Sequence, residues 1–238
     1  MRMSSHQKLS VVMPFYNERD NIELLLNKYE RFTQKYNFEL LCVNNGSTDG
    51  SEKVFIRYLR NKKYQFIKLV TIKKNIGYGY GIMAGVHKAI GEVIAWTHAD
   101  MQTDPADVFR AYDNYIKQND SMIIVKGKRK GRPLTDSIIS MCMGIIATVM
   151  LRVSLYEINA QPKLFPASFV WHLTHPPNDF MLDLYFLYIA KKNRYKISTI
   201  NVNFYKRLHG KSKWALSWHS RLFMIINTSK YIKYLSTS

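Results

Sequence analysis

The chain has 238 residues, of which 47% are hydrophobic and 13% aromatic, so it can bury one sizeable core and is too apolar to be disordered. Its 35 Lys and Arg residues against 17 Asp and Glu residues give a formal net charge of +18, which favours polyanionic partners such as nucleic acid, anionic lipid headgroups or phosphorylated substrates. The only two cysteines, Cys42 and Cys142, lie in apolar runs, which argues against a disulfide scaffold and indicates a reducing compartment. The first ten residues, MRMSSHQKLS, are polar and do not resemble a secretory signal.

Short apolar runs alternate with helix-length segments through the first half of the chain. The runs of strand length are LSVVM (9–13), FELLCV (38–43), IKLVTI (67–72) and EVIAW (92–96). After the first run, Asp20 and Glu23 have the spacing of a capping box that opens an amphipathic helix. Strands that alternate with helices predict a parallel sheet with helices on both faces, and such sheets bind ligands beyond the carboxyl ends of their strands.

The polar segments that follow these four runs carry groups suited to a nucleotide. Tyr16 is suited to stacking on a base, Glu18 to ribose hydroxyls and Asn45 to the edge of a base. The segment KNIGYGYG (74–81) offers close backbone approach at Gly77, Gly79 and Gly81, although a lone glycine-spaced loop is more often a tight turn. Because four such loops meet at one sheet edge, we expect a nucleotide site there.

The segment IAWTHADMQTDPAD (94–107) places possible ligands directly after the fourth run. If the strand geometry continues, His98, Asp100 and Gln102 share one face, because alternate side chains of a strand point the same way. The structural alternative is a strand end followed by a helix that begins near Pro105, with Asp104 or its neighbours as the cap.

These motifs together resemble the family 2 inverting glycosyltransferases, which have a GT-A fold. PFYNE resembles the first-strand motif of that family, NNGSTDG its D-D-G-S-T-D loop and HADMQTDP its D-A-D-x-Q-x-P metal motif. The resemblance implies an α/β fold with a Rossmann-like mixed sheet flanked by helices, and a divalent cation, Mg or Mn, held by Asp100 and Gln102. It implies a UDP- or GDP-linked sugar bound by Pro14, Tyr16, Glu18, Asn45, Gly77, His98, Ala99 and Asp100.

Two positions depart from the family pattern. Asn44 and Asn45 stand where the family usually has two aspartates, which makes the identity of the base less certain because an amide both donates and accepts. His98 stands where the metal motif begins with aspartate. We expect His98 to contact ribose or water, and the alternative is a nitrogen ligand that suits Mn better than Mg.

Later segments are similar to the polyprenyl-phosphate sugar synthases, among them dolichyl-phosphate mannose synthases. They are NAQPKLF (159–165), PPNDFMLDLY (176–185) and RLHGKSK (207–213). GKRKGR (127–132) is expected to be a basic loop that precedes the apolar run 138–151, which is shorter than the roughly 20 residues that span a bilayer. This adjacency suits an anionic membrane surface or a lipid phosphate, so we expect peripheral attachment at the cytoplasmic face of a membrane.

We expect transfer of the sugar, with inversion, to a membrane lipid acceptor, a polyprenyl phosphate; the alternative is a sugar hydroxyl of a lipid-linked glycan, and the choice of acceptor decides whether the reaction needs a base. A lipid phosphate is already anionic and needs positive groups, for which Arg129 and Arg132 are the candidates. A sugar hydroxyl of a lipid-linked glycan needs a carboxylate base, for which Asp179 and Asp183, one helical turn apart, are the candidates.

Candidates to close over the diphosphate follow near the end of the domain. They are Arg207 and Lys213 of the segment RLHGKSK (207–213), for which the structural alternative is an ordinary basic loop. We expect a tail at 1–8, one catalytic domain at 9–214 and a C-terminal amphipathic, interfacial helix at 215–238 that equally suits core packing. A basic nucleic-acid-binding protein is the alternative from another class, but no nucleic acid is expected because the candidate loops lack interleaved basic and aromatic residues.

Overall fold

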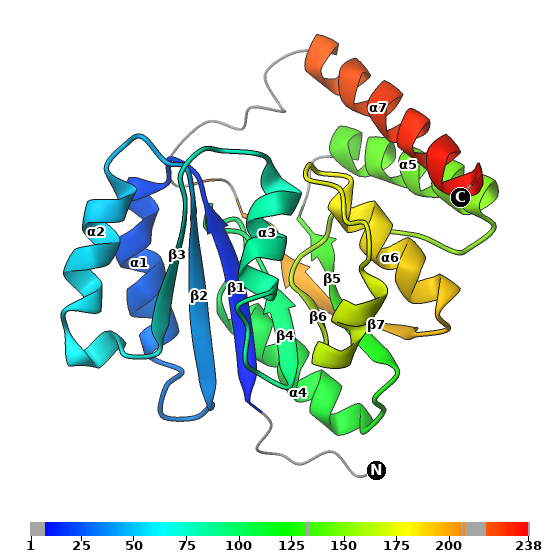
Figure 1. Ribbon diagram of the computed structural model, residues 1–238. Coiled ribbons are helices and arrows are strands. Elements are labelled where there is room, and N and C mark those ends of the chain that lie inside the picture. The colour runs from blue at the N-terminus through cyan, green and yellow to red at the C-terminus, as the bar shows by residue number, and fades with distance from the viewer. Residues whose placement is uncertain (1–7, 132–133, 206, 208–217, 238) are drawn as a thin grey trace.

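The computed structural model describes residues 8–131, 134–205, 207 and 218–237, and its centre is a mixed sheet in the order β3-β2-β1-β4-β6-β5-β7 (Figure 1). The strands are β1 (Leu9–Phe15), β2 (Phe38–Asn45), β3 (Ile67–Ile72), β4 (Val93–Trp96), β5 (Ile123–Lys130), β6 (Lys163–Pro166) and β7 (Lys196–Asn203). The helices are α1 (Arg19–Glu30), α2 (Ser51–Leu59), α3 (Tyr78–Val86), α4 (Ala106–Gln118), α5 (Leu134–Leu151), α6 (Leu182–Lys192) and α7 (Trp218–Thr237), with short 3-10 turns at Lys62–Tyr64 and Ala167–His172.

Strand direction brings most loops of interest to one edge of the sheet. β1 pairs in parallel with β2 and β4, and β2 pairs in parallel with β3. β6 is antiparallel to both β4 and β5, and β5 is parallel to β7. The carboxyl ends of β1 to β5 and of β7 therefore meet at one edge, which confirms the expected mixed sheet and the four strands expected in the first half.

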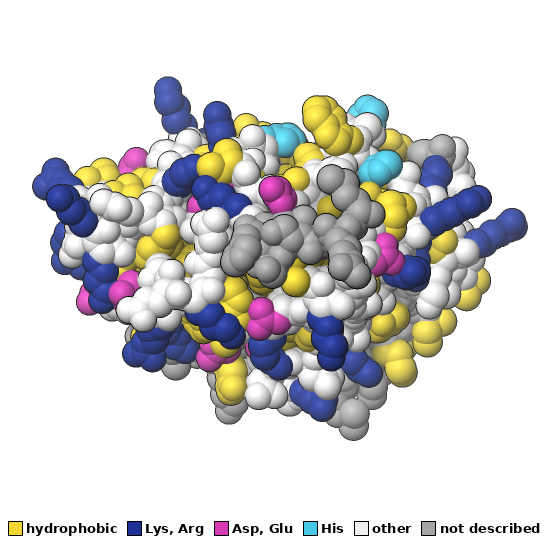
Figure 2. Space-filling view, turned by 90° about the horizontal axis from the view of Figure 1, so that it is seen from below, with side chains coloured by type: hydrophobic (Ala, Val, Ile, Leu, Met, Phe, Trp, Pro, Cys, Tyr) yellow, Lys and Arg dark blue, Asp and Glu magenta, His cyan; other side chains and the backbone are white. Residues whose placement is uncertain are grey.

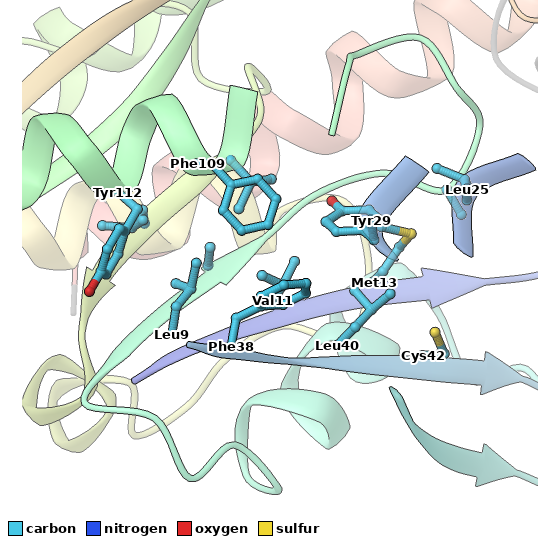
Figure 3. Close-up of a cluster of buried hydrophobic side chains, with 14 of the residues drawn as sticks. Leu9, Val11, Met13, Leu25, Tyr29, Phe38, Leu40, Cys42, Phe109 and Tyr112 are labelled. Atoms are coloured by element: carbon cyan, nitrogen blue, oxygen red, sulfur yellow. The ribbon is translucent and has the colours of Figure 1, made fainter. Parts of the chain in front are cut away.

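Both faces of the sheet are buried, as an alternating α/β sequence requires. One face packs against α1, α2 and α4, and its cluster includes Val11, Met13, Leu40, Tyr29 and Phe109 (Figure 3). The other face packs against α3, α5, α6 and α7, through a second cluster that is centred on Trp96, Phe165 and Phe186. Val11 and Met13 of β1 belong to the first cluster and Val12 between them to the second, so hydrophobic burial on both sides fixes the register of the strand.

Two local expectations were wrong. Residues 127–130 of the expected basic loop lie in β5, because their backbone groups pair with β7 as far as the register Lys130↔Asn203. The capping box does not form at α1, which begins at Arg19, one residue before Asp20. The Arg19 N–H instead donates to Asp49 Oδ2 at 3.0 Å, so the cap comes from the loop after β2.

The C-terminal helix α7 packs beside α5, as Figure 1 shows at the upper right. Ile232 and Leu235 of α7 are buried in the second cluster, and the Tyr188 hydroxyl of α6 donates to the Leu235 carbonyl at 3.4 Å. Part of α7 therefore belongs to the hydrophobic core. Within the described parts of the chain, no helix combines the length and the apolar character that crossing a bilayer requires.

Candidate active site

Two of the loops at the carboxyl edge are fastened to each other. Asn17, with a positive φ of 56°, donates its N–H to Ser47 Oγ at 3.1 Å, and its side-chain oxygen accepts from the Thr48 N–H at 2.8 Å. Asp49 Oδ1 in turn accepts from the Ser51 N–H at 3.0 Å, at the start of α2. These bonds hold the loop after β2 against the loop that carries Tyr16 and Glu18, both of them partly buried.

Asn45 and the glycine-spaced segment are also in contact. The Asn45 side-chain N–H donates to the Gly77 carbonyl at 2.9 Å, and its Oδ1 is buried with no hydrogen-bond partner among the described residues. A Cβ on Gly77, whose φ is +145°, would lie 2.2 Å from the Asn178 carbonyl oxygen, and a Cβ on Gly79 equally close to the Pro177 carbonyl. The close backbone approach that these glycines permit is therefore to the segment before α6.

The loops after β1 and β4 bring three acceptors together around one guanidinium. Arg207 Nη2 lies 2.9 Å from Asp100 Oδ2, and its Nε donates to Gln102 Oε1 at 3.3 Å. Its Nη1 lies 3.8 Å from Glu18 Oε1. Burial raises the pKa of Glu18, with a hydrogen bond from Asn21 opposing the rise and the Asp100 carboxylate adding to it. We call Glu18, Asp100 and Gln102, with Arg207 between them, the acidic centre.

The acidic centre arises from a turn and not from a continued strand. β4 ends at Trp96, Met101 has a φ of 59°, and the Gln102 N–H folds back to Asp100 Oδ1 at 3.1 Å. The expected shared strand face of His98, Asp100 and Gln102 was therefore wrong, although Asp100 and Gln102 do converge. The Ala106 N–H donates to Asp104 Oδ1 at 2.9 Å, so Asp104 caps the start of α4 as the structural alternative predicted.

The donor set of the acidic centre suits a hard divalent cation. Carboxylate and amide oxygens are the ligands that Mg²⁺ and Mn²⁺ take in proteins, and the three acceptors already surround a positive charge. No group of three or more His, Cys, Asp or Glu residues able to hold a metal occurs within the described ranges, so Asp100 and Gln102 would share the ion with oxygens from a ligand.

His98 lies between the acidic centre and a second group of charges. Its ring is partly buried, with its centroid 6.0 Å from that of Tyr78. Burial lowers the pKa of His98, and the carboxylates of Asp100 and Asp183 oppose this from either side. The neighbouring Ala99 is buried, whereas Pro14 at the end of β1 is partly buried.

The second group centres on a buried ion pair. Asp183, in the first turn of α6, pairs through Oδ1 with Lys163 Nζ, and both side chains are almost fully buried. The same oxygen accepts from Gln161 Nε2 at 3.2 Å, and the Tyr78 hydroxyl lies 3.5 Å from Oδ2. Gln161 Nε2 also donates to the Tyr78 hydroxyl at 2.9 Å. The Asp183 carboxylate is thus held by a lysine, an amide and a phenol.

Two further cations lie beside this pair on β5. Lys126 lies opposite Lys163 in the antiparallel register and is only 1% exposed. Its Nζ donates to the Glu157 carbonyl at 3.0 Å and lies 4.6 Å from the centre of the Tyr156 ring. Arg129 Nε donates to Glu157 Oε2 at 2.8 Å, and its buried Nη2 has no hydrogen-bond partner among the described residues.

This basic centre, defined by Lys126, Arg129 and Lys163 with Asp183 and Glu157, contains three cations and two carboxylates. Burial, with the nearby charge of Lys163 adding to it, lowers the pKa of Lys126 to about 7. Buried positive charge without a matching carboxylate is unfavourable in a folded protein, and an anion that enters the centre offsets it.

The remaining predicted residues fall outside these two centres. Asp179 is exposed in the turn before α6 and accepts from the Met181 N–H at 2.9 Å, so it is not one helical turn from Asp183 on a shared helix. Arg132 and Lys213 lie outside the described residues. Lys126, Lys163 and Gln161 were not predicted as site residues from the sequence, although a lysine inside an apolar strand run, as in IIVK and KLFP, is an available signal.

Comparison with known proteins agrees with this arrangement. The glycosyl transferase family 2 model matches residues 10–158. An undecaprenyl-phosphate 4-deoxy-4-formamido-L-arabinose transferase of Photorhabdus laumondii is 32% identical over 46% of this chain and 34% of its own length. A dodecaprenyl-phosphate galacturonate synthase of Rhizobium johnstonii is 25% identical over 92% of this chain and 64% of its own length.

Solved structures share the fold at low sequence identity. Glucosyl-3-phosphoglycerate synthase of Mycobacterium tuberculosis has a TM-score of 0.71 and 17% identity, over 95% of this chain and 80% of that structure. A mannosyltransferase of Pyrobaculum calidifontis in complex with GDP-Man and Mn²⁺ has a TM-score of 0.69 and 18% identity, over 97% of this chain and 65% of that structure. This chain spans 39% and 34% of the first two curated relatives. The match to the family model, which extends from β1 to the loop after α5, shows that the chain belongs to glycosyl transferase family 2.

Proposed function

We propose that this protein transfers a sugar, with inversion, from a nucleotide-diphosphate sugar to a lipid phosphate, and that its basic centre binds this acceptor. One observation carries the choice of acceptor: Lys163, Gln161 and Tyr78 already hold the Asp183 carboxylate. To take a proton from an acceptor hydroxyl, this carboxylate would have to give up its contact with Lys163 and leave the buried lysine charge uncompensated. The site therefore favours an acceptor that needs no base.

A phosphate monoester fits that requirement. Its second pKa is about 6, so near neutral pH its oxygen attacks without first losing a proton to the protein. The phosphate also needs nearby cations, because the donor diphosphate repels it. Arg129, whose buried Nη2 has no hydrogen-bond partner in the described part of the chain, supports this role, and two relatives are named for undecaprenyl phosphate and dodecaprenyl phosphate.

The acidic centre supports the donor side of the proposal. A divalent cation held there would stabilise the negative charge that develops on the departing nucleotide diphosphate. Asp100 and Gln102 would hold it, while Asn45 Oδ1, which has no partner within the described ranges, would supply an acceptor for the base. The solved neighbours were crystallised with UDP or with GDP-Man, so both nucleotides belong in the donor screen.

Peripheral attachment to an anionic membrane completes the proposal. Met141, Ile145 and Val149 recur every four residues along α5, so they form one row on the helix, and Val149 is 70% exposed. The opposite side of the helix, with Gly144 and Ala147, is buried. An exposed apolar row is suited to lie in a membrane surface. Lys and Arg side chains are spread over the face seen in Figure 2 and do not form one patch there.

Single-turnover transfer at saturating donor tests the acceptor assignment, with a short-chain polyprenyl phosphate and a sugar-hydroxyl acceptor in parallel. Arg129→Met is expected to lower transfer to the lipid phosphate by at least about tenfold, while nucleotide binding, measured as thermal stabilisation, persists. Asp183→Asn is expected to be milder once circular dichroism shows that the variant is folded. A loss of 10²-fold to 10⁴-fold in Asp183→Asn, typical of a missing base, with Arg129→Met unaffected, would establish the hydroxyl acceptor instead.

Flotation with liposomes tests the membrane part. Val149→Glu is expected to reduce recovery with anionic vesicles, because it places a charge in the exposed row without disturbing a buried contact. Ile56→Glu on α2, where Ile56 is also exposed, is the matched control and should float like the unmodified protein. Equal recovery of Val149→Glu and the unmodified protein would remove α5 from membrane attachment.

A further inference from the structure

Arg207 occupies the position at which the proposed function requires a divalent cation. Its guanidinium contacts Asp100 Oδ2 at 2.9 Å, Gln102 Oε1 at 3.3 Å and Glu18 Oε1 at 3.8 Å. Asp100 and Gln102 are the two residues with the donor chemistry for the ion, and both are already bonded to this one side chain. The guanidinium fork thus satisfies the oxygens that a metal would take.

Hydrogen bonds between Tyr205 and Gln102 hold the segment that carries Arg207. The Tyr205 N–H donates to the Gln102 carbonyl at 2.9 Å, and Gln102 Nε2 donates to the Tyr205 carbonyl at 3.2 Å. These two bonds fasten the chain after β7 to the loop after β4. The Arg207 side chain is 27% exposed, whereas that of Asp100 is 8% exposed, so their ion pair is only partly screened by water.

The Arg207 guanidinium and a divalent metal ion compete for the same oxygens of Asp100 and Gln102. Asp100 Oδ1 already accepts the Gln102 N–H, and Asp100 Oδ2 pairs with Arg207, so neither carboxylate oxygen is without a partner. A divalent ion that coordinates Asp100 Oδ2 competes with the guanidinium for that oxygen and is repelled by it while it stays nearby. A nucleotide diphosphate changes this balance, because its oxygens can pair with a displaced arginine and complete the shell of the metal.

We propose that Arg207 is a built-in counter-cation of the acidic centre, which holds Asp100 and Gln102 in the nucleotide-free protein and moves to the diphosphate when metal and nucleotide bind. This inference rests on the proposed function, since it needs the metal site. It makes metal and nucleotide binding synergistic. Each ligand binds weakly alone, because the metal is needed to replace the arginine and the diphosphate is needed to give the arginine a new partner.

Electron paramagnetic resonance titration of Mn²⁺, with and without UDP or GDP, tests the inference by counting free ion and requires no turnover. Arg207→Met and Arg207→Gln are both expected to bind Mn²⁺ about tenfold more tightly than the unmodified protein without nucleotide, within the usual range of coupling between sites. The tightening by nucleotide should shrink in both variants. Arg57→Met removes the same charge from a surface pair with Glu23 and is the matched control, with no expected change.

The outcomes distinguish a failure of the counter-cation role from a failure of the proposed metal site. Mn²⁺ affinity that is unchanged or weaker in both folded Arg207 variants, while nucleotide still promotes binding, would overturn the counter-cation role and leave the metal site standing. Absence of Mn²⁺ binding by the unmodified protein and by both variants, even with UDP or GDP, would overturn the metal site and the inference together. A gain of similar size in Arg57→Met would show a general charge effect and would also overturn the inference.

Discussion

Lys126 provides the most quantitative check on the basic centre. Its ammonium is buried on β5, with the Glu157 carbonyl at 3.0 Å as its nearest hydrogen-bond acceptor. Burial lowers its pKa from the ordinary value of 10.5 to about 7. Lys163 and Arg129 also lower this pKa, while Glu157 and Asp183 raise it. Lys126→Met keeps a chain of similar length and removes the titrating group.

The sign and size of the pH effect follow from proton linkage. Between pH 7 and 10.5 the unfolded chain keeps the proton on Lys126 while the folded protein has lost it, so the free energy of unfolding rises with pH. Each pH unit in this window contributes about 1.4 kcal/mol. From pH 7.5 to pH 9 the unmodified protein should therefore gain about 2 kcal/mol relative to Lys126→Met. Packing changes and the lost bond to the Glu157 carbonyl change the free energy of unfolding of the variant by an amount that does not depend on pH.

Urea unfolding followed by tryptophan fluorescence at pH 7.5, 8.25 and 9 measures this difference. Comparing the two proteins cancels every other group that titrates equally in both. Lys128→Met is the matched control, because Lys128 lies on the same strand with its side chain exposed, and its curve should run parallel to that of the unmodified protein. Parallel stability curves for Lys126→Met and the unmodified protein would refute the argument that Lys126 is buried without an adequate partner.

Three further predictions address the fold and the acidic centre. Asp100→Asn should abolish the thermal stabilisation that a nucleotide with Mn²⁺ gives, and stabilisation of normal size would exclude Asp100 as a metal ligand. Gly77→Ala should lower the free energy of unfolding by about 2 kcal/mol or more, because its Cβ would lie 2.2 Å from a carbonyl oxygen; Gly50→Ala, also at positive φ but with its Cβ no closer than 4.0 Å to Arg19 Nη1, should lose less in the same urea assay. Lys163→Met should cost about 3–5 kcal/mol by leaving Asp183 unpaired, and adding Asp183→Asn should recover part of that cost; no recovery would contradict the ion pair.

The first half of the fold was predictable because its signals are local. β3 matches the run 67–72 at both ends, and β1, β2 and β4 differ from their predicted runs by at most two residues at an end. Strands buried on both faces leave uninterrupted apolar runs in a sequence, and these runs are easy to recognise. The positions of the polar loops were also predictable, because the direction of parallel strands fixes where their carboxyl ends lie.

The second half was harder because its signals depend on partners distant in sequence. β5 continues through GKRK, which has no strand pattern of its own, because β7 pairs with it more than 60 residues later. Lys126 and Lys163 face each other only through the antiparallel pairing of β5 with β6. The contact of Arg207 with Asp100 likewise joins two loops that only the sheet brings together. No periodicity in the sequence encodes such contacts.

In the proposed function, Asp183 is a positioning group and not a base, and the two charge centres support this proposal. His98 lies within electrostatic reach of both centres, since Asp100 and Asp183 both raise its pKa while Lys163 and Arg129 lower it. A donor diphosphate at the acidic centre and an anionic acceptor at the basic centre would each meet cations of the chain. Freeing the Asp183 carboxylate to act as a base would leave Lys163 buried without its partner and the positive charge of the centre unbalanced. An acceptor that brings its own negative charge reverses that imbalance, and a neutral sugar hydroxyl does not.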